Sequence, residues 1–101
     1  MTDKIKTFPF DPAKYLKTDE EIAYFIEEAL SDGDLNYIAH ALGVAARARG
    51  MTHIAKETGL GRESLYKALS AEGNPEFGTI LRVMKALGLK LSVSPIEHDA
   101  N

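Results

Sequence analysis

The stretch MTHIAKETGLGRESLYKALSA, residues 51–71, decides the fold of this chain. Its apolar spacing predicts two short helices, over about 52–58 and 62–71, and Gly59 and Gly61 mark the turn between them. Two short helices joined by a three- or four-residue turn that contains glycine form a helix-turn-helix arrangement. Gly59 can adopt the positive φ that this turn requires.

The side chains of this stretch suit close packing of its two helices. Ala55 is small, as a close crossing of two helices requires. The competing interpretation, a helical hairpin with a purely structural role, is disfavoured by the further helices predicted around it. The wedge between the two helices is expected to be filled by Ile54, Leu60 and Leu65.

The sequence before this stretch predicts two longer helices. Thr18 and Glu21 form a capping box at the start of the first helix, and Gly33 ends it. Asp34 caps the second helix, which ends at Gly50. Each helix carries apolar residues at helical spacing, which indicates one buried face. These residues are Ile22, Phe25, Ile26, Ala29 and Leu30 in the first helix, and Leu35, Ile38, Ala39, Leu42 and Ala46 in the second.

A fifth helix is predicted after the stretch, and Gly88 ends it. Asn74, Pro75 and Glu76 indicate its start, because Asn caps helices, Pro suits the first turn and an acid favours the positive end of the helix dipole. Its apolar residues at helical spacing are Phe77, Ile80, Leu81, Met84 and Leu87.

A strand is predicted at residues 89–95, where Leu89, Leu91 and Val93 alternate with polar residues. A lone strand leaves half of its backbone polar groups unpaired. Its partner is either the segment near Ile5 or the same strand of a second chain, which would form a two-stranded ribbon across a twofold axis. In the second case these three apolar residues are the expected dimer contacts.

The chain is therefore expected to be all-α, with a five-helix helix-turn-helix domain and a short C-terminal β-strand that pairs across a dimer. Pro9 and Pro12 disfavour a helix before Ala13, so the N-terminus is expected to be an extended arm that packs on another surface. The expected divisions are an arm over 1–17, the helical domain over 18–88 with its motif at about 51–71, the strand over 89–95 and a tail over 96–101.

Composition and charge narrow the classes of function. The 101 residues are 45% hydrophobic and 27% charged, which suits one globular domain, and no cysteine is present for a disulfide or a thiolate site. No secretory signal or membrane-spanning run is visible, so we expect a cytoplasmic protein without membrane contact. Residues 1–45 carry a net charge of −5 and residues 46–90 one of +4. This division indicates either two surfaces with different partners or chance scatter in a small chain, and charge alone does not decide between them. The basic part includes Arg47 and Arg49, which are expected to attract DNA non-specifically.

An enzymatic function is disfavoured, and we expect neither a metal nor a cofactor. His40, His53 and His98 lack the paired spacing of metal ligands. The adjacent glutamates at 20–21 and 27–28 would diverge on a helix rather than converge. No pattern of residues resembles a catalytic nucleophile with its general base, and no run of glycines has the spacing of a phosphate-binding loop.

The second motif helix is the predicted DNA-reading element, because its N-terminal residues face base edges in the major groove. Arg62 can donate two hydrogen bonds to guanine, and Ser64 can contact a base or a phosphate. Tyr66 and Lys67, further along, suit a phosphate or a thymine methyl. Thr52, at the start of the first motif helix, can cap a phosphate. For each residue the alternative interpretation is a solvated surface side chain.

The chain resembles the small antidote (antitoxin) proteins of type II addiction modules, the HigA-like group with a phage-repressor-type helix-turn-helix. The resemblance rests on the segments FDPAKYLKTDEEIAYFIEEAL, ARARGMTHIAKETGLGRESLYKALSAEGNP and ILRVMKALGLKLSV. It implies a homodimer that neutralises a RelE/ParE-like toxin encoded beside it and binds its own operator, a double-stranded DNA, as a transcriptional repressor. Ala68 departs from the pattern, which usually has a larger aliphatic residue there, and we expect Leu69 to supply that packing.

The resemblance also implies a basic toxin, so toxin binding is expected on the acidic N-terminal part through charge complementarity. Two other functions stay open. One is a free-standing helix-turn-helix regulator with no toxin partner, and the other is a protein-interaction module without DNA binding, which the basic middle disfavours. The residues expected to contact the toxin are Phe8, Phe10, Tyr15 and Phe25.

Overall fold

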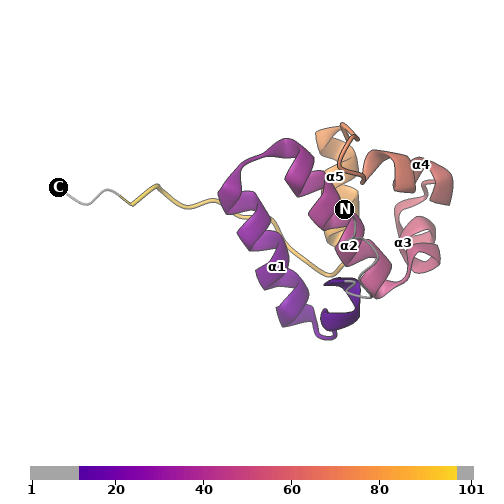
Figure 1. Cartoon of the computed structure of the whole chain (residues 1–101), viewed down its shortest axis with the longest axis horizontal. Helices are drawn as coiled ribbons and strands as arrows, with labels where there is room; N and C mark the ends of the chain where they lie inside the picture. The colour runs from indigo at the N-terminus through magenta and orange to yellow at the C-terminus, as the bar shows by residue number, and fades with distance from the viewer. Residues whose placement is uncertain (1–11, 98–101) are drawn as a thin grey trace, which may run out of the picture.

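The computed structural model describes residues 12–97 of the chain, which form a bundle of helices (Figure 1). This described part contains five α-helices and no strand, so the predicted all-α class is confirmed there. In chain order the elements are the 3-10 helix η2 (Pro12–Tyr15) and the helices α1 (Asp19–Asp32), α2 (Leu35–Arg49), α3 (Met51–Thr58), α4 (Arg62–Ala68) and α5 (Phe77–Ala86).

The central helix of the fold is α2. It contacts η2, α1, α3 and α4, and in Figure 1 it lies between α1 on one side and α3 with α4 on the other. Four of its alanines are buried, and these small side chains let neighbouring helices approach on several faces. Each large aliphatic side chain buried around it contributes about 1.5–3 kcal/mol. The largest fully buried side chains are Ile22, Leu42, Ile54, Leu65, Leu87, Val44 and Val83.

The predicted caps of α1 and α2 are confirmed. The Glu21 N–H donates to Thr18 Oγ1 at 3.1 Å, and the Thr18 N–H donates to Glu21 Oε1 at 3.0 Å. Gly33 ends α1 with a φ of 82°, and the Asp34 carboxylate accepts from the Asn36 N–H at 2.9 Å. These caps satisfy backbone donors that the first turn of each helix leaves without partners.

An extended arm is predicted over residues 1–17. In the part of this segment that the structure describes, from residue 12 onward, the prediction is wrong. Residues 12–15 form η2, because Pro12 stands first in this helix, where its missing N–H is not needed. The Leu16 N–H then donates to the Ala13 carbonyl at 3.3 Å, and the Leu16 side chain packs against the core. Phe8 and Phe10 lie outside the described residues.

The predicted end of α4 at residue 71 is also wrong, since the helix ends at Ala68. The chain leaves the helix at Leu69, whose side chain is buried with 4% exposed. There the backbone meets α2 so closely that a Cβ on Gly43 would overlap the Leu69 carbonyl oxygen. This close contact fixes where α4 stops.

The predicted start of α5 at Asn74 and Pro75 is two residues too early. The helix begins at Phe77, with Glu76 as its N-cap and no side-chain cap. Pro75 is buried, so it packs into the fold instead of opening the first turn. At the start of α5, tertiary packing therefore overrides the helix-start pattern of the sequence.

Residues 89–97 follow α5 as irregular backbone, so the strand predicted over 89–95 is absent from the described residues. A strand needs a neighbour to receive its backbone hydrogen bonds, and no second strand lies within residues 12–97. The segment starts with the Leu89 N–H bonded to the Met84 carbonyl at 2.8 Å. It then runs against α1, with which it lines a hollow.

Candidate functional site

A three-residue turn joins α3 to α4, and Thr58 holds it in place. The buried Thr58 hydroxyl donates to the Ile54 carbonyl at 2.8 Å and accepts from the Leu60 N–H at 3.2 Å. Gly59 has the positive φ expected of it, 77°, and its N–H donates to the Ala55 carbonyl at 2.9 Å. The sequence reasoning missed Thr58, although a threonine in the last helical turn before a glycine is a typical local hydrogen-bonding residue.

The packing between α3 and α4 agrees with the prediction. Ile54 and Leu65 are fully buried, and Leu60 and Ala55 pack against the core from partly exposed positions. Leu69 is buried, so the expectation that it supplies the packing of this region is confirmed. These contacts fix the angle at which α4 leaves the turn.

A single glycine, Gly50, joins α2 to α3. Its φ of 110° lets the chain reverse direction within one residue, and its carbonyl accepts the first backbone hydrogen bond of α3, from Ile54, at 3.0 Å. The end of α2 and the start of α3 therefore lie side by side on one surface.

That surface is hollowed into a groove of about 480 Å³, which we call the basic groove. All of its charged residues are basic, and they come from η2, α2 and α4. Thr52, Arg62 and Tyr66, three of the five predicted DNA contacts, meet here with Arg47. The sequence reasoning missed Lys14, which the fold brings in from η2. The lining residues are Ala13, Lys14, Arg47, Ala48, Gly50, Met51, Thr52, Arg62 and Tyr66.

On α4 the predicted contacts divide between two faces. The Arg62 guanidinium lies 5.9 Å from the centroid of the Tyr66 ring, a cation–π contact that orients the arginine toward the basic groove. Ser64 and Lys67 are exposed and line a separate hollow with Glu63 and Tyr66. Tyr66 borders both hollows, so the exposed surface of α4 is continuous from Arg62 to Lys67.

Arg49, which we expected to attract DNA non-specifically, is not among the residues that line the basic groove. Its guanidinium forms an ion pair with the Asp19 carboxylate, which joins the end of α2 to the start of α1. The Asp19 side chain is 62% exposed, so the pair contributes little to stability, about 0–1 kcal/mol. Its effect is to place an arginine against α1 rather than in the basic groove.

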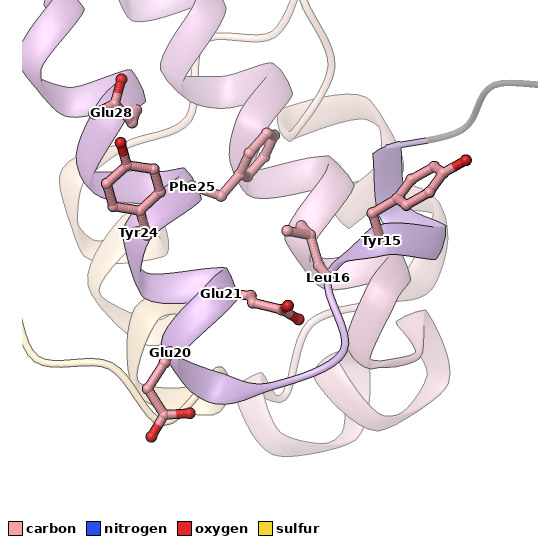
Figure 2. Close-up of a pocket in the computed structure, with 7 residues that line it drawn as sticks. All are labelled: Tyr15, Leu16, Glu20, Glu21, Tyr24, Phe25 and Glu28. Carbon is pink, nitrogen blue, oxygen red and sulfur yellow. The ribbon is translucent and has the colours of Figure 1, made fainter.

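The described residues expected to contact a toxin lie in a second groove of about 410 Å³, which we call the acidic groove (Figure 2). The Tyr15 side chain is 62% exposed at one edge, and Phe25 is partly buried against the core. The groove runs between α1 and the segment around η2. Its lining residues are Tyr15, Leu16, Glu20, Glu21, Tyr24, Phe25 and Glu28.

The three predicted dimer contacts differ in exposure. Leu89 packs against the core of its own chain, Leu91 is 36% exposed and Val93 is 96% exposed. Apolar surface available to a second chain is therefore concentrated toward the far end of this segment.

Within residues 12–97 no three histidine or acidic side chains come together in an arrangement that could hold a metal ion. In the same range no helix has both the length and the apolar character needed to cross a membrane.

The chain is similar to a family model and to a known protein. A family model described as "Probable addiction module antidote protein" matches residues 6–95. A protein of Haemophilus influenzae (strain ATCC 51907 / DSM 11121 / KW20 / Rd), named only "Uncharacterized protein", is 47% identical over 93 residues, which cover 92% of this chain and 94% of that protein. No solved structure matches the chain.

Proposed function

This chain belongs to the probable addiction module antidote family, and we propose that it neutralises a RelE/ParE-like toxin and represses its own operator as a dimer. An antidote has a toxin partner by definition. The observation that carries the DNA-binding part is the basic groove beside the α3–turn–α4 unit, because its charges come from separate elements and converge without an acid among them.

In this proposal α3 and α4 act as a helix-turn-helix of the HigA-like, phage-repressor type. The start of α4 enters the major groove, where Arg62 donates to guanine and Ser64 contacts a base or a phosphate. Lys67 and Tyr66 contact the flanking phosphates. Thr52, which lies at the start of α3 and lines the basic groove, donates to a phosphate of the DNA.

The repressor is proposed to bind as a homodimer, with two copies of α4 about 34 Å apart on one face of the duplex. Residues 89–95 of the two chains would meet at the twofold axis. Leu91 and Val93 then supply the apolar contact across this axis, while Leu89 anchors each segment to its own core. The operator is accordingly expected to be palindromic.

Toxin neutralisation is proposed to occur on the acidic N-terminal part, away from the α4 surface. Helix α1 has six acidic residues and no basic one, which favours encounter with a basic partner. We place this function in the cytoplasm, where operator DNA and an intracellular toxin target are found.

The DNA part is tested by mobility shift of the DNA upstream of the gene, titrated with protein across a salt series. Arg62→Ala should weaken binding to the specific site by roughly 10–100-fold and leave non-specific binding measurable. The matched control is Arg82→Ala, which removes a positive charge from an exposed position on α5 outside the basic groove. Equal losses from the two variants, or no retardation beyond random DNA, would contradict the proposal.

The toxin part is tested by expressing the chain together with the product of the neighbouring gene. A small basic protein that co-purifies, and whose growth inhibition the chain relieves, is the expected result. Specific operator binding without such a partner would instead favour the second candidate, a free-standing helix-turn-helix regulator.

A further inference from the structure

The acidic groove has an apolar floor and an aromatic edge on either side. Figure 2 shows Leu16 and Phe25 facing each other from the η2 segment and from α1, with Tyr15 and Tyr24 farther out. Tyr24 is 64% exposed and Tyr15 is 62% exposed, so two aromatic rings remain in contact with water around one hollow. Such a combination favours a partner that covers the rings.

The acidic residues of the groove differ in the hydrogen bonds that their carboxylates make within the chain. Glu21 accepts the N–H groups of Lys17 at 2.7 Å and Thr18 at 3.0 Å, so its carboxylate is used by the helix cap. These backbone donors hold the pKa of Glu21 below its usual range. The carboxylates of Glu20 and Glu28 have no hydrogen bond or ion pair with any residue of the described part, and both residues are exposed. Two carboxylates are thus available to a ligand.

The charge of the groove selects one sign of partner. None of its lining residues is basic, and the helix that supplies its acids has no basic residue at all. A cationic side chain with an apolar stem fits this surface best, because its stem can cover Leu16 and Phe25 while its charge meets a carboxylate. The Tyr24 ring next to Glu28 adds the face that a guanidinium or ammonium group prefers.

We propose that the acidic groove is the docking site for a lysine- or arginine-bearing amphipathic segment of the toxin. This inference rests on the proposed function and adds the residues and the chemistry of contact. One cation of that segment lies between Tyr24 and Glu28, and a second meets Glu20. The two acids are eight residues apart on α1, or about 12 Å along the helix axis, which sets the spacing of the two cations.

The first test measures the affinity of purified variants for the co-purified toxin, the product of the neighbouring gene. Glu28→Lys and Tyr24→Ala should each weaken binding by roughly 10–100-fold, since one reverses a contact charge and the other removes an aromatic wall. The matched controls are Glu27→Lys, an adjacent acid of α1 that lines a different hollow, and Tyr37→Ala, an exposed tyrosine on α2. Tyr37→Ala should bind the toxin like the parent protein, and Glu27→Lys should lose less affinity than Glu28→Lys, because it changes the overall charge of α1 without removing a groove contact.

The second test identifies the docked segment. Overlapping 15-residue peptides that cover the toxin sequence are titrated against the parent protein by fluorescence anisotropy. The strongest peptides should carry at least two basic residues, lose affinity with added salt and fail to bind Glu28→Lys. A charge reversal of the toxin's contact residue should restore binding to Glu28→Lys.

The outcomes separate this inference from the function beneath it. If the parent protein captures no toxin, the proposed function fails. If it captures toxin and the two groove variants bind as tightly as their controls, or if neutral or acidic peptides bind best, the function stands and the docking site is wrong.

Discussion

The basic groove and the acidic groove take neighbouring residues from one short segment, Lys14 for the first and Tyr15 for the second, yet they are assembled in different ways. The three charges of the basic groove come from η2, α2 and α4. The three charges of the acidic groove all come from α1. One surface therefore depends on the whole fold, and the other depends chiefly on a single helix and the turn before it.

This difference predicts that faults in the packing of α4 should disable the two grooves unequally. The sharpest place to introduce such a fault is the contact between α2 and the end of α4, where Gly43 leaves room for a carbonyl oxygen.

Gly43→Ala should therefore have the largest effect. The added Cβ would overlap the Leu69 carbonyl oxygen, and backbone on both sides leaves little room to adjust, so we expect a loss of about 3 kcal/mol in the free energy of unfolding. Urea denaturation measures it. At a temperature where the variant stays folded, operator affinity should fall further than toxin affinity, because only the basic groove needs α4.

The control for this variant is Gly78→Ala, also within a helix but with open space where its Cβ would lie. It should leave stability unchanged or raise it by about 0.5–1 kcal/mol, since alanine favours a helix. Equal stability of the two variants would show that α2 and α4 are not in close contact at Gly43.

The same contrast explains which features of the fold and of the two grooves could be predicted from the sequence. The capping box at Thr18, the glycine turn at Gly59 and the buried face of α1 depend on residues three or four apart, and local patterns captured them. The acidic charge of α1 was readable for the same reason. Lys14 in the basic groove was not, because it lies 33 residues before Arg47 and only the fold brings them together.

The errors have the same origin. The early end of α4 and the late start of α5 are set by Leu69 and Pro75, which are drawn into the core by neighbours distant in sequence. The strand at 89–95 was predicted from alternation alone, which describes a face but supplies no hydrogen-bonding partner. A periodic apolar pattern shows which side of a helix or strand is apolar. Tertiary packing decides where that helix or strand ends.

A second prediction uses Lys14, the member of the basic groove nearest the acidic one. Lys14→Ala should weaken operator binding several-fold and lower the slope of log affinity against log salt by about 0.9, the loss of one phosphate contact. Specificity among operator sequences should be unchanged, because a phosphate contact reads no base. Toxin affinity should also be unchanged.

Lys17→Ala is the matched control, since it removes the same charge three residues later at an exposed position outside both grooves. If the salt slope of Lys14→Ala equalled that of the parent protein, η2 would not contact DNA. A loss of toxin binding by the same variant would mean that the two grooves do not act separately.

The smallest predicted effect concerns Glu21, the acid of the acidic groove whose carboxylate is used by the helix cap. Because its folded pKa lies below the usual glutamate value, its stabilisation is complete above about pH 4.3 and is lost as the pH falls through the folded value. Glu21→Gln should retain the cap hydrogen bonds, as glutamine also serves in a capping box, and should flatten the acid limb of stability measured by urea denaturation.

Glu20→Gln separates the acid that caps the helix from the acid that we propose to bind the toxin. It removes the same charge one residue earlier, where no capping hydrogen bond is lost, so the acid limb should persist and toxin affinity should fall. Glu21→Gln should show the opposite pairing, with a flattened limb and near-parent toxin affinity. If both variants reduced toxin affinity equally, the acidic groove would act through its total charge, and the distinction between a capping carboxylate and a docking carboxylate would not hold.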